Sequence, residues 1–436
     1  MKIYRTDKAP RVYHTRVEPT LKAATATLSV DPNTHYQTVI GFGGAFTESA
    51  THTLSKMSSE NQSKVLHAYF DPEDGLGYTL GRVHLNSSDF SLGNYTYVDE
   101  RDETLNSFSI AREYQTVIPT ILKAETINGR KFSFLASPWS PPGWMKTTGI
   151  MNHGGKLKKE YYPLWAKYVI KYLDAMKKAG VHIDMISVQN EPAAVQTWDS
   201  CLFTPEEERD FIKDHLGPAL EKSSHSHVNI LAWDHNKDII LDRMAPIYDD
   251  PKARDYTYGA AFHWYMSDDY LNLEKMHDLY PDKHLIFTEG CIEDGPRVGA
   301  YETGVRYIKD MIQDFNHYTE AFIDWNLFLD ENGGPNHAHN YCDAPIICDT
   351  KNDTVHLNSS FYAIKHFSKH VKPGAVRIAS GVSTDVIMHS AYRNPDGSTA
   401  IVLFNDSDAD HIIDVDGTHI HLPAESMMTL IKEPHV

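Results

Sequence analysis

The chain has 436 residues, 41% of them hydrophobic and 23% charged, an ordinary composition for a folded protein with a sizeable core. This length exceeds what one hydrophobic core usually supports, so we expect one large domain with a smaller one beside it. The formal net charge of −18 disfavours binding to nucleic acid or to anionic membrane surfaces, and a neutral substrate fits better.

The N-terminal segment has no apolar run like that of a signal peptide, and no later segment is long and apolar enough to span a bilayer. We therefore expect a soluble protein without stable membrane insertion, and a cytoplasmic one if the chain is bacterial and complete. The four cysteines include no CxxC pair and are too sparse for a disulfide scaffold.

Short β-rich runs alternate with long amphipathic stretches through most of the chain. The predicted strands are Val39–Gly43, Thr79–Leu85, Phe132–Ser137, Met185–Gln189, Asn229–Ala232, Gly259–His263, His284–Thr288 and Ala321–Trp325. A typical stretch between them carries Tyr161, Trp165, Tyr168, Tyr172 and Met176, whose spacing of three or four residues places them on one helical face. Eight strand–helix repeats predict an α/β fold, a parallel sheet closed into a (β/α)8 TIM barrel.

The two flanks have a different pattern. After about Gly374, short alternating runs are separated by turn signals at Asn394–Gly397 and Asp416–Gly417. The stretch Leu21–Val30 also resembles a strand, so we expect an accessory β-sandwich formed from both chain termini. The predicted division is N-terminal strands over 1–35, the catalytic barrel over 36–373 and the rest of the sandwich over 374–436.

Carboxylates, amides and aromatic rings gather at the ends of the predicted strands, where barrels of this type carry their catalytic residues. Aromatic rings stack on the C–H faces of a sugar, while amides and carboxylates bind its hydroxyls. The candidates at these ends are Asp89, Trp139, Asn190, Glu191, His263, Tyr265, Glu289 and Trp325. Asp234 and His235 end the fifth strand and are expected to lie next to the site.

Two glutamates end the fourth and seventh predicted strands, which face each other across the barrel mouth. Glycoside hydrolysis needs one carboxylic acid to protonate the leaving oxygen and a second carboxylate opposite the anomeric carbon. Glu191 and Glu289 fit these roles, and the Asn190 amide is placed to bind the sugar 2-hydroxyl. Asn-Glu-Pro can also simply begin a helix, but a second strand-end glutamate favours the catalytic pair.

Longer motifs surround these residues. They are Gly41–Glu48, Ser137–Trp144, Gln189–Pro192, Cys201–Pro205, His263–Tyr265, Thr288–Cys291, Asp324–Leu327 and Gly333–Asn336. Together they resemble the glucosylceramidase-like (acid β-glucosidase) branch of glycoside hydrolase family 30, from about residue 38 to about residue 372. The combination is highly specific, although each motif alone would be weak.

This resemblance implies a retaining exo-β-glycosidase that hydrolyses β-glucosides through a covalent glycosyl-enzyme intermediate, and the named branch acts in sphingolipid metabolism. Glu289 would be the nucleophile and Glu191 the acid/base. A glucose-sized −1 subsite is also implied, with hydroxyls held by Asp89, Trp139, Trp325 and Asn340.

The resemblance further places His263 and Tyr265 beside the carboxylates, among the substrate-binding residues, with Tyr265 hydrogen-bonded to the nucleophile. The reaction also requires a particular protonation state of each glutamate. Glu289 must stay ionised to attack, and we expect Glu191 to hold its proton near neutral pH, with a pKa that rises further when Glu289 is charged.

Two departures from the family pattern lie on the aglycone side. The loop Ala193–Ser200 is shorter than in the lysosomal enzymes and carries Trp198, a further candidate for substrate contact. His337 stands where those enzymes have a tryptophan. The sugar subsite is therefore implied by the resemblance, whereas a ceramide aglycone is not.

Metal and thiol chemistry are weakly indicated. His337-Ala-His339 could place two imidazoles on one side of a strand, but metal-dependent barrel hydrolases carry such a pair at the end of the first strand, where this chain has Gly41–Gly44. We expect no catalytic metal and no cofactor. Cys291 is interpreted as a small packed side chain beneath the nucleophile, since no histidine partner for an activated thiol is readable.

Two alternative activities within the family remain, a β-xylosidase and a β-1,6-glucan hydrolase. A xylosidase pocket must exclude the hydroxymethyl group on C6 of glucose, so the ratio of glucoside to xyloside turnover separates it from a glucosidase. A non-catalytic carbohydrate-binding protein would be expected to lack a catalytic carboxylate, and both glutamates are present. The oligomeric state is left open.

Overall fold

Eight parallel strands close into a barrel in the order β10-β11-β4-β5-β6-β7-β8-β9. The computed structural model describes residues 1–9 and 11–434. The barrel strands are β4 (Gly41–Ala45), β5 (Leu80–Leu85), β6 (Ser133–Pro138), β7 (Ile183–Ser187), β8 (Asn229–Asn236), β9 (Thr257–His263), β10 (His284–Glu289) and β11 (Ala321–Asn326). The predicted TIM barrel is confirmed, with strand limits that shift by a few residues.

Small and branched side chains fill the inside of the barrel. This inner cluster comprises Leu80, Leu135, Met185, Leu231, Ala261, Ile286, Ala321 and Ile323, one or two from each of seven strands. A packed interior of this kind closes the barrel below its mouth. The polar residues Ser187, Asp234 and Glu289 lie at or near the C-terminal ends of their strands, above this cluster.

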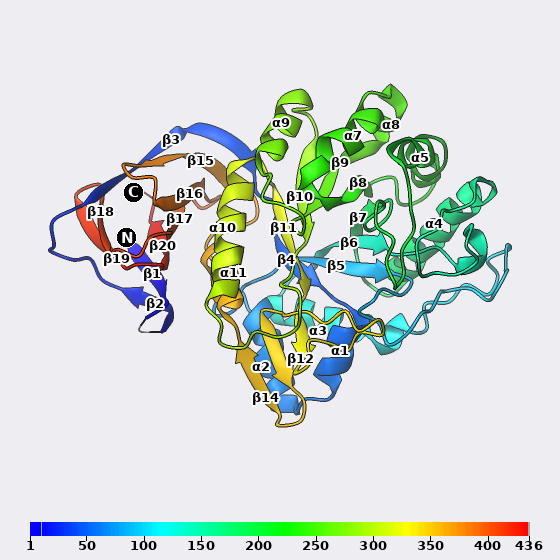
Figure 1. Ribbon diagram of the computed structural model, residues 1–436, viewed down its shortest axis with the longest axis horizontal. Helices are drawn as coiled ribbons and strands as arrows, with labels where there is room; N and C mark the ends of the chain where they lie inside the picture. Colours follow the sequence, from blue (N-terminus) through cyan, green and yellow to red (C-terminus); the bar gives the residue numbers. More distant parts are fainter. Residues whose placement is uncertain (10, 435–436) are drawn as a thin grey trace.

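Helices cover the outside of the barrel (Figure 1). They are α1 (Glu48–Ser55), α2 (Ser59–Phe70), α3 (Val117–Asn128), α4 (Tyr162–Lys178), α5 (Pro205–Phe211), α6 (Gly217–Glu221), α7 (Ile240–Tyr248), α8 (Pro251–Tyr256), α9 (Leu271–Leu279), α10 (Glu302–Asn316) and α11 (Ser359–Ser368). Short 3-10 turns lie at Glu113–Gln115, Gly143–Met145, Lys159–Tyr161 and Lys237–Ile239, and a π-turn at Ile212–Leu216 joins α5 to α6.

Local sequence signals explain where several helices begin. The Thr47 hydroxyl accepts the Ala50 N–H at the start of α1, and Thr204 forms a reciprocal capping box with Glu207 at the start of α5. Helix α4 buries Trp165, and with it the apolar face predicted from the sequence.

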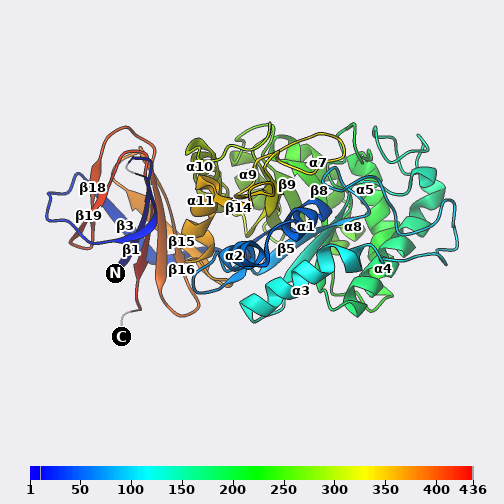
Figure 2. The ribbon, with the colours of Figure 1, turned by 90° about the horizontal axis from the view of Figure 1, so that it is seen from below.

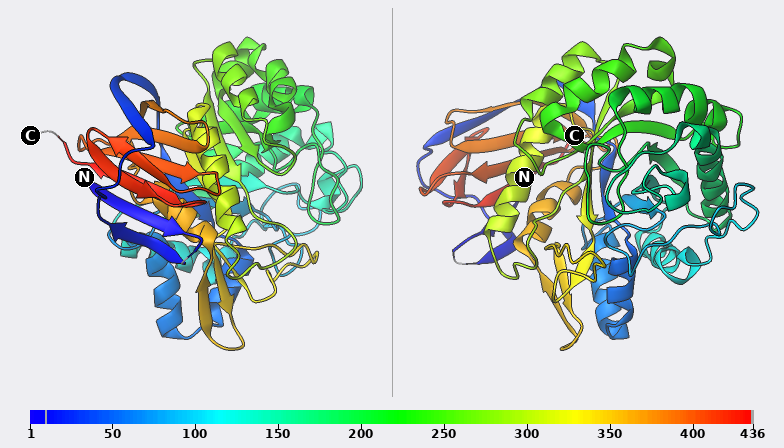
Figure 3. Two further views of the ribbon diagram at one scale, coloured as in Figure 1. Left: turned by 60° about the vertical axis from the view of Figure 1, so that its left-hand side comes forward. Right: turned by 45° about the vertical axis from the view of Figure 1, so that its right-hand side comes forward.

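A nine-stranded sheet lies beside the barrel, in the order β19-β18-β3-β15-β16-β17-β20-β1-β2. Its strands are β1 (Lys2–Asp7), β2 (Val12–Val17), β3 (Ala26–Thr38), β15 (Val376–Val382), β16 (Ile387–Arg393), β17 (Thr399–Asn405), β18 (His411–Val415), β19 (Thr418–Leu422) and β20 (Met427–Lys432). Figure 3 shows its curvature. Residues from both halves share one core, including Ile3, Leu28, Ile413 and Leu430.

The predicted sandwich built from both termini is therefore confirmed. The two turn signals are confirmed as well, because Asn394–Gly397 joins β16 to β17 and Asp416–Gly417 joins β18 to β19. Strand β3 starts and ends later than the predicted stretch Leu21–Val30 and runs past residue 35, so the exact domain limits stay a prediction.

Helices α10 and α11 lie between the barrel and the sheet, and Figure 2 shows the sheet at one end of the molecule, with both chain ends on it. His366 on α11 crosses this interface. Its ring nitrogens lie 2.9 Å from Thr6 Oγ1 on β1 and 2.8 Å from Thr429 Oγ1 on β20. These contacts tie the first and last strands of the chain to the barrel.

The connection after β11 forms a small sheet of β12 (Phe328–Asp330), β13 (Ile346–Asp349) and β14 (Thr354–Leu357). The segment between β12 and β13 carries Asn336, His337 and Asn340 to the barrel mouth. Among residues 1–9 and 11–434, no helix has the length and apolar character needed to cross a membrane.

Candidate active site

Glu191 and Glu289 meet at the barrel mouth. Glu289 is the last residue of β10, and Glu191 lies in the loop four residues after β7. One oxygen of each carboxylate and one ring nitrogen of His263 lie within 4.8 Å of one another. Glu191 has a positive φ of 50°, a conformation that costs about 1–3 kcal/mol and is typical of functional sites.

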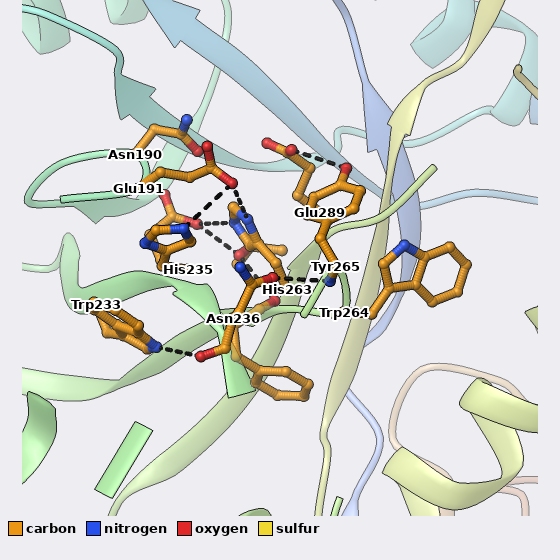
Figure 4. A network of polar contacts seen from close by, with 12 residues as sticks. Asn190, Glu191, Trp233, His235, Asn236, His263, Trp264, Tyr265 and Glu289 are labelled. Atoms are coloured by element: carbon orange, nitrogen blue, oxygen red, sulfur yellow. Dashed lines mark hydrogen bonds and ion pairs between the residues drawn. The ribbon is translucent and has the colours of Figure 1, made fainter. Parts of the chain in front are cut away.

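Two donors hold Glu289. Arg82 Nη1 lies 2.5 Å from its Oε2, and the Tyr265 hydroxyl donates to its Oε1 at 3.0 Å, as the family resemblance implied (Figure 4). Burial raises the pKa of Glu289, while the charges of His263 and Arg82 oppose that rise. Because the guanidinium is permanently charged and in direct contact, this environment favours the carboxylate form needed for attack.

Two imidazoles face Glu191. Its Oε1 lies 3.4 Å from His263 Nδ1 and 3.7 Å from His235 Nε2 (Figure 4). Burial acts to raise the pKa of Glu191, but His235 and His263 outweigh it and lower the pKa below its usual value. This differs from the raised pKa expected from the sequence, because that expectation did not include two histidines within reach.

Glu191 and His263 share one proton. Burial acts to lower the pKa of His263, but the surrounding carboxylates, Glu289 first among them, raise it to about 9. At neutral pH His263 therefore carries a proton next to Glu191. Transfer of that proton from Nδ1 to the carboxylate makes Glu191 a neutral acid without changing the number of protons in the site.

His263 is fully buried and ends β9, and its Nδ1 contacts Glu191 in the loop after β7. Its Nε2 lies 3.0 Å from Asp234 Oδ1 on β8. Its part in binding the substrate, which the family resemblance implied, stays a prediction.

Asp234 is the centre of a buried polar network beneath the site. It accepts hydrogen bonds from Arg82 Nη2 at 2.9 Å, Ser137 at 3.1 Å, Ser187 at 2.5 Å and Thr288 at 2.6 Å. Burial acts to raise the pKa of Asp234, but Arg82 and the hydroxyl donors hold it far below its usual range. The carboxylate is fully ionised and fixes the ends of β5, β6, β7 and β10 relative to one another.

Arg82 is the functional residue that the sequence interpretation missed. Besides Glu289 and Asp234 it donates to Asn190 Oδ1 at 2.9 Å, and its guanidinium lies 4.8 Å from the ring centroid of Trp139. An arginine in the mostly apolar strand Leu80–Leu85, whose one other polar residue is His84, was the available signal, because a charged residue is almost never fully buried without partners.

Aromatic rings and amides form the floor of the site. Trp139 and Trp325 stack with ring centroids 5.1 Å apart. The Oδ2 atom of Asp89 accepts Asn340 Nδ2 at 3.0 Å and Asn336 Nδ2 at 3.1 Å, and Asn336 was not predicted. Burial raises the pKa of Asp89 to about 7, although the two amides oppose the rise. Such a carboxyl can donate to or accept from a sugar hydroxyl near neutral pH.

The two glutamates open into one cavity of about 620 Å³. The predicted residues that line it are Asp89, Trp139, Asn190, Glu191, Trp198, Tyr265, Glu289, Trp325 and Asn340. The sequence interpretation had not placed Asn236 or Met266 there. Asn236 accepts the Tyr265 backbone N–H at 2.8 Å and so positions the tyrosine that contacts Glu289 (Figure 4).

Within the described residues, Glu191, His263 and Glu289 form the one group of three possible metal ligands. Each is already engaged, Glu289 by Arg82 and Tyr265, and His263 by Asp234. A guanidinium in contact with one ligand repels a cation. This arrangement fits proton transfer and nucleophilic attack better than metal binding.

Comparison with known proteins gives the same picture. The chain matches the glycosyl hydrolase family 30 TIM-barrel domain over residues 39–371 and the β-sandwich domain of that family over residues 374–430. It is 37% identical to the lysosomal acid glucosylceramidase of Mus musculus over 406 residues, which are 88% of this chain and 78% of that protein.

Two solved structures are similar over the whole chain. SrfJ from Salmonella typhimurium has a TM-score of 0.94 at 35% identity, and an endo-β1,6-glucanase has a TM-score of 0.88 at 31% identity. Each comparison covers 100% of this chain and 99% of the other. The chain therefore belongs to glycosyl hydrolase family 30 and is a glycoside hydrolase.

Proposed function

We propose that the protein is a retaining exo-β-glycosidase that hydrolyses β-glucosides through a covalent glycosyl-enzyme intermediate. The observation that carries this proposal is the approach of the Glu191 and Glu289 carboxylates to within 4.8 Å. Retaining enzymes hold their two carboxyl groups about 5–5.5 Å apart, whereas inverting enzymes leave about 6.5–9.5 Å for a water molecule. The short separation supports direct attack by the enzyme.

In this mechanism Glu289 attacks the anomeric carbon while Glu191 gives its proton to the glycosidic oxygen, so that the aglycone leaves as an alcohol. Glu191 then removes a proton from water, which hydrolyses the intermediate. The proton taken from water restores the one that Glu191 and His263 share, and Arg82 and Tyr265 keep Glu289 ionised and aimed. The contacts of Asn190 with Arg82 fix its amide for the sugar 2-hydroxyl.

A glucose-sized sugar is the proposed occupant of the −1 subsite. Trp139 and Trp325 offer ring faces to its C–H groups, and Asp89 with Asn340 offers acceptors and donors to its hydroxyls. The similarity to a glucosylceramidase supports glucose over xylose at this position. Both catalytic carboxylates are present, so a non-catalytic carbohydrate-binding role has no support.

Three exposed apolar side chains line the cavity on the proposed aglycone side. Val195, Ile239 and Met266 line it with 61%, 41% and 69% of their surfaces exposed. They come from the loops after β7, β8 and β9, and Trp198 lies beside them. Exposed apolar side chains gathered at a binding site favour an apolar partner. We infer that glucosides with an apolar aglycone are better substrates than oligosaccharides.

A β-1,6-glucan hydrolase is the second candidate, because an endo-β1,6-glucanase is 31% identical over the whole chain. A panel of substrates separates the two. Alkyl and aryl β-glucosides, the matching β-xylosides and a β-1,6-linked glucan are compared by kcat/KM, and NMR identifies the anomer first released. We expect β-glucose and the highest kcat/KM on the alkyl or aryl glucosides. Initial release of α-glucose would refute retention, and preference for the glucan would select the second candidate.

The nucleophile is tested separately. A 2-deoxy-2-fluoro β-glucoside with a good leaving group traps the covalent intermediate of a retaining enzyme, and mass spectrometry locates the label. We expect one label per chain on Glu289 and none in Glu289→Gln. Glu293→Gln is the matched control, because Glu293 lines the same cavity and should leave labelling intact. Labelling of any other residue would overturn the assignment.

A further inference from the structure

Two buried thiols line the active-site cavity, and the proposed mechanism uses neither. Cys291 lies two residues after Glu289, and Cys342 lies between β12 and β13. Their exposed fractions are 6% and 2%. They pack in the same small cluster as Trp139 and Trp325. The thiols therefore form part of the wall around the proposed −1 subsite.

The backbone brings these two cysteines together from distant parts of the chain. Glu293 and Cys342 form an isolated antiparallel bridge, and Asp343 N donates to Ile292 O at 2.8 Å. Residues 291 and 293 point to the same side of this pair, which places Cys291 diagonally opposite Cys342. Both side chains pack in one cluster, and the neighbouring Cys342 thiol raises the pKa of Cys291. This contact is a built feature of the cavity wall.

The geometry suits a bridging ion better than a disulfide. Diagonal positions on an antiparallel pair are about 7–8 Å apart, near or beyond the Cα separation of about 7 Å at which a disulfide needs backbone movement. Two metal–thiolate bonds of about 2.3 Å each reach across about 4.6 Å between sulfurs. Soft cations prefer thiolate ligands over oxygen ligands.

We propose that Cys291 and Cys342 form a binding site for one soft, thiophilic divalent cation, and that its binding shuts off the active site. The ion displaces the two thiol protons, M²⁺ + 2 RSH → M(SR)₂ + 2 H⁺, and no electron transfer occurs. This property goes beyond the proposed function, because the site takes an inorganic ligand and performs no step of hydrolysis.

Inhibition follows from what surrounds the thiols. The Tyr265 hydroxyl lies 3.5 Å from Cys291 Sγ and donates to Glu289 at 3.0 Å. An ion held by Cys291 therefore takes space at the floor of the sugar subsite, next to the tyrosine that contacts the nucleophile. The net charge of −18 attracts cations to the chain as a whole.

Binding should strengthen as the pH rises. The neighbouring Cys342 thiol and burial raise the pKa of Cys291 well above its usual value, and the nearby Glu289 charge adds to the rise. Cys291 is therefore protonated near neutral pH, and the cation must displace its proton to bind. Alkylating reagents, which need a preformed thiolate, should react slowly at this site.

The test uses Cd²⁺ with the full chain. Thiolate-to-metal charge-transfer absorption in the ultraviolet reports binding, and hydrolysis of an aryl glucoside, relative to each variant's own metal-free rate, reports inhibition. For the unmodified protein we expect one ion per chain, loss of activity in parallel with the absorption, and tighter binding at pH 8 than at pH 6. A glucose-shaped iminosugar inhibitor should compete with the ion.

Cys342→Ala should require at least about tenfold more Cd²⁺ for both readouts, equivalent to about 1.4 kcal/mol of binding free energy. Cys348→Ala is the matched control, since Cys348 is a buried thiol on β13 that does not line the cavity, and it should behave like the unmodified protein. Cys342→Ser preserves the side-chain size and replaces the alanine variant if circular dichroism shows that the latter is unfolded.

Unchanged Cd²⁺ binding in a folded Cys342 variant, or lost binding in Cys348→Ala, would overturn the proposal. The absorption does not depend on any glycoside. If the protein failed to hydrolyse glucosides, the proposed function would fall while this test still gave an answer.

Discussion

Replacing Arg82 by glutamine tests whether one buried guanidinium keeps Glu289 ionised. Arg82 is fully buried and contacts Glu289 at 2.5 Å and Asp234 at 2.9 Å. Glutamine is uncharged and shorter, so both carboxylates lose their cationic partner. Breaking a buried ion pair by removing one member costs about 3–5 kcal/mol, because the remaining charge is left uncompensated.

The effect on catalysis has a definite sign. An adjacent arginine lowers the pKa of a carboxyl by about 1–3 units, so its removal raises the pKa of Glu289 by a similar amount. The nucleophile is then protonated over a wider acidic range. We expect the acid limb of the kcat/KM profile to move about 1–3 units towards higher pH, with a lower plateau.

The assay is kcat/KM for an aryl β-glucoside between pH 4 and pH 9, combined with urea unfolding. Arg243→Gln is the matched control, because Arg243 pairs with the buried Glu208 at 2.9 Å and does not touch Glu289. That variant should lose stability but keep the position of the acid limb. An active Arg82→Gln enzyme with an unshifted acid limb would refute the reasoning.

Three further predictions concern protons elsewhere in the molecule. Glu191→Gln should greatly slow hydrolysis of alkyl glucosides but spare substrates with very acidic leaving groups, as kcat/KM on both classes will show; equal losses would remove Glu191 from the acid role. Burial opposes protonation of His337, but Asp199 at 3.4 Å raises its pKa, so the pair stabilises the fold below about pH 6.5 and is lost as the pH rises through the raised value. Urea unfolding should therefore separate His337→Gln from the unmodified protein more at pH 6 than at pH 9, and a constant difference would contradict this. Burial and neighbouring histidines lower the pKa of His366 far below 6.5, so its contribution is present above about pH 6.5 and is lost as the pH falls. In His366→Gln the loss of unfolding free energy between pH 7 and pH 5 should be smaller, and an equal loss would show that other groups dominate.

The barrel and the approach of Glu191 to Glu289 could be predicted because both depend on repeating local patterns. Strand–helix alternation implies a parallel barrel, and in a parallel barrel all strands end at the same rim. Glu191 and Glu289 follow or end strands, so their meeting required no knowledge of side-chain packing. The turn at Asn394–Gly397 was predictable for the same reason, since its signal lies within four residues.

The proton chemistry could not be predicted in the same way. The lowered pKa of Glu191 depends on His235 and His263, which come from two other strands and approach it only through the register of the closed sheet. The role of Arg82 likewise depends on which carboxylates its guanidinium meets across the barrel. The residues were visible in the sequence, but their partners were not.

By itself, the sequence determined the barrel, the sandwich built from both termini and the candidate rim residues, because each follows from short-range periodicity and from the directional rule of parallel strands. The tertiary structure decided that Cys291 meets Cys342, that His263 holds Glu191, and that Asn336 joins Asn340 on Asp89. The reason is physical: hydrogen bonds and charge interactions act over a few ångströms, and the distances between strands are set by barrel closure and packing, which no local pattern encodes.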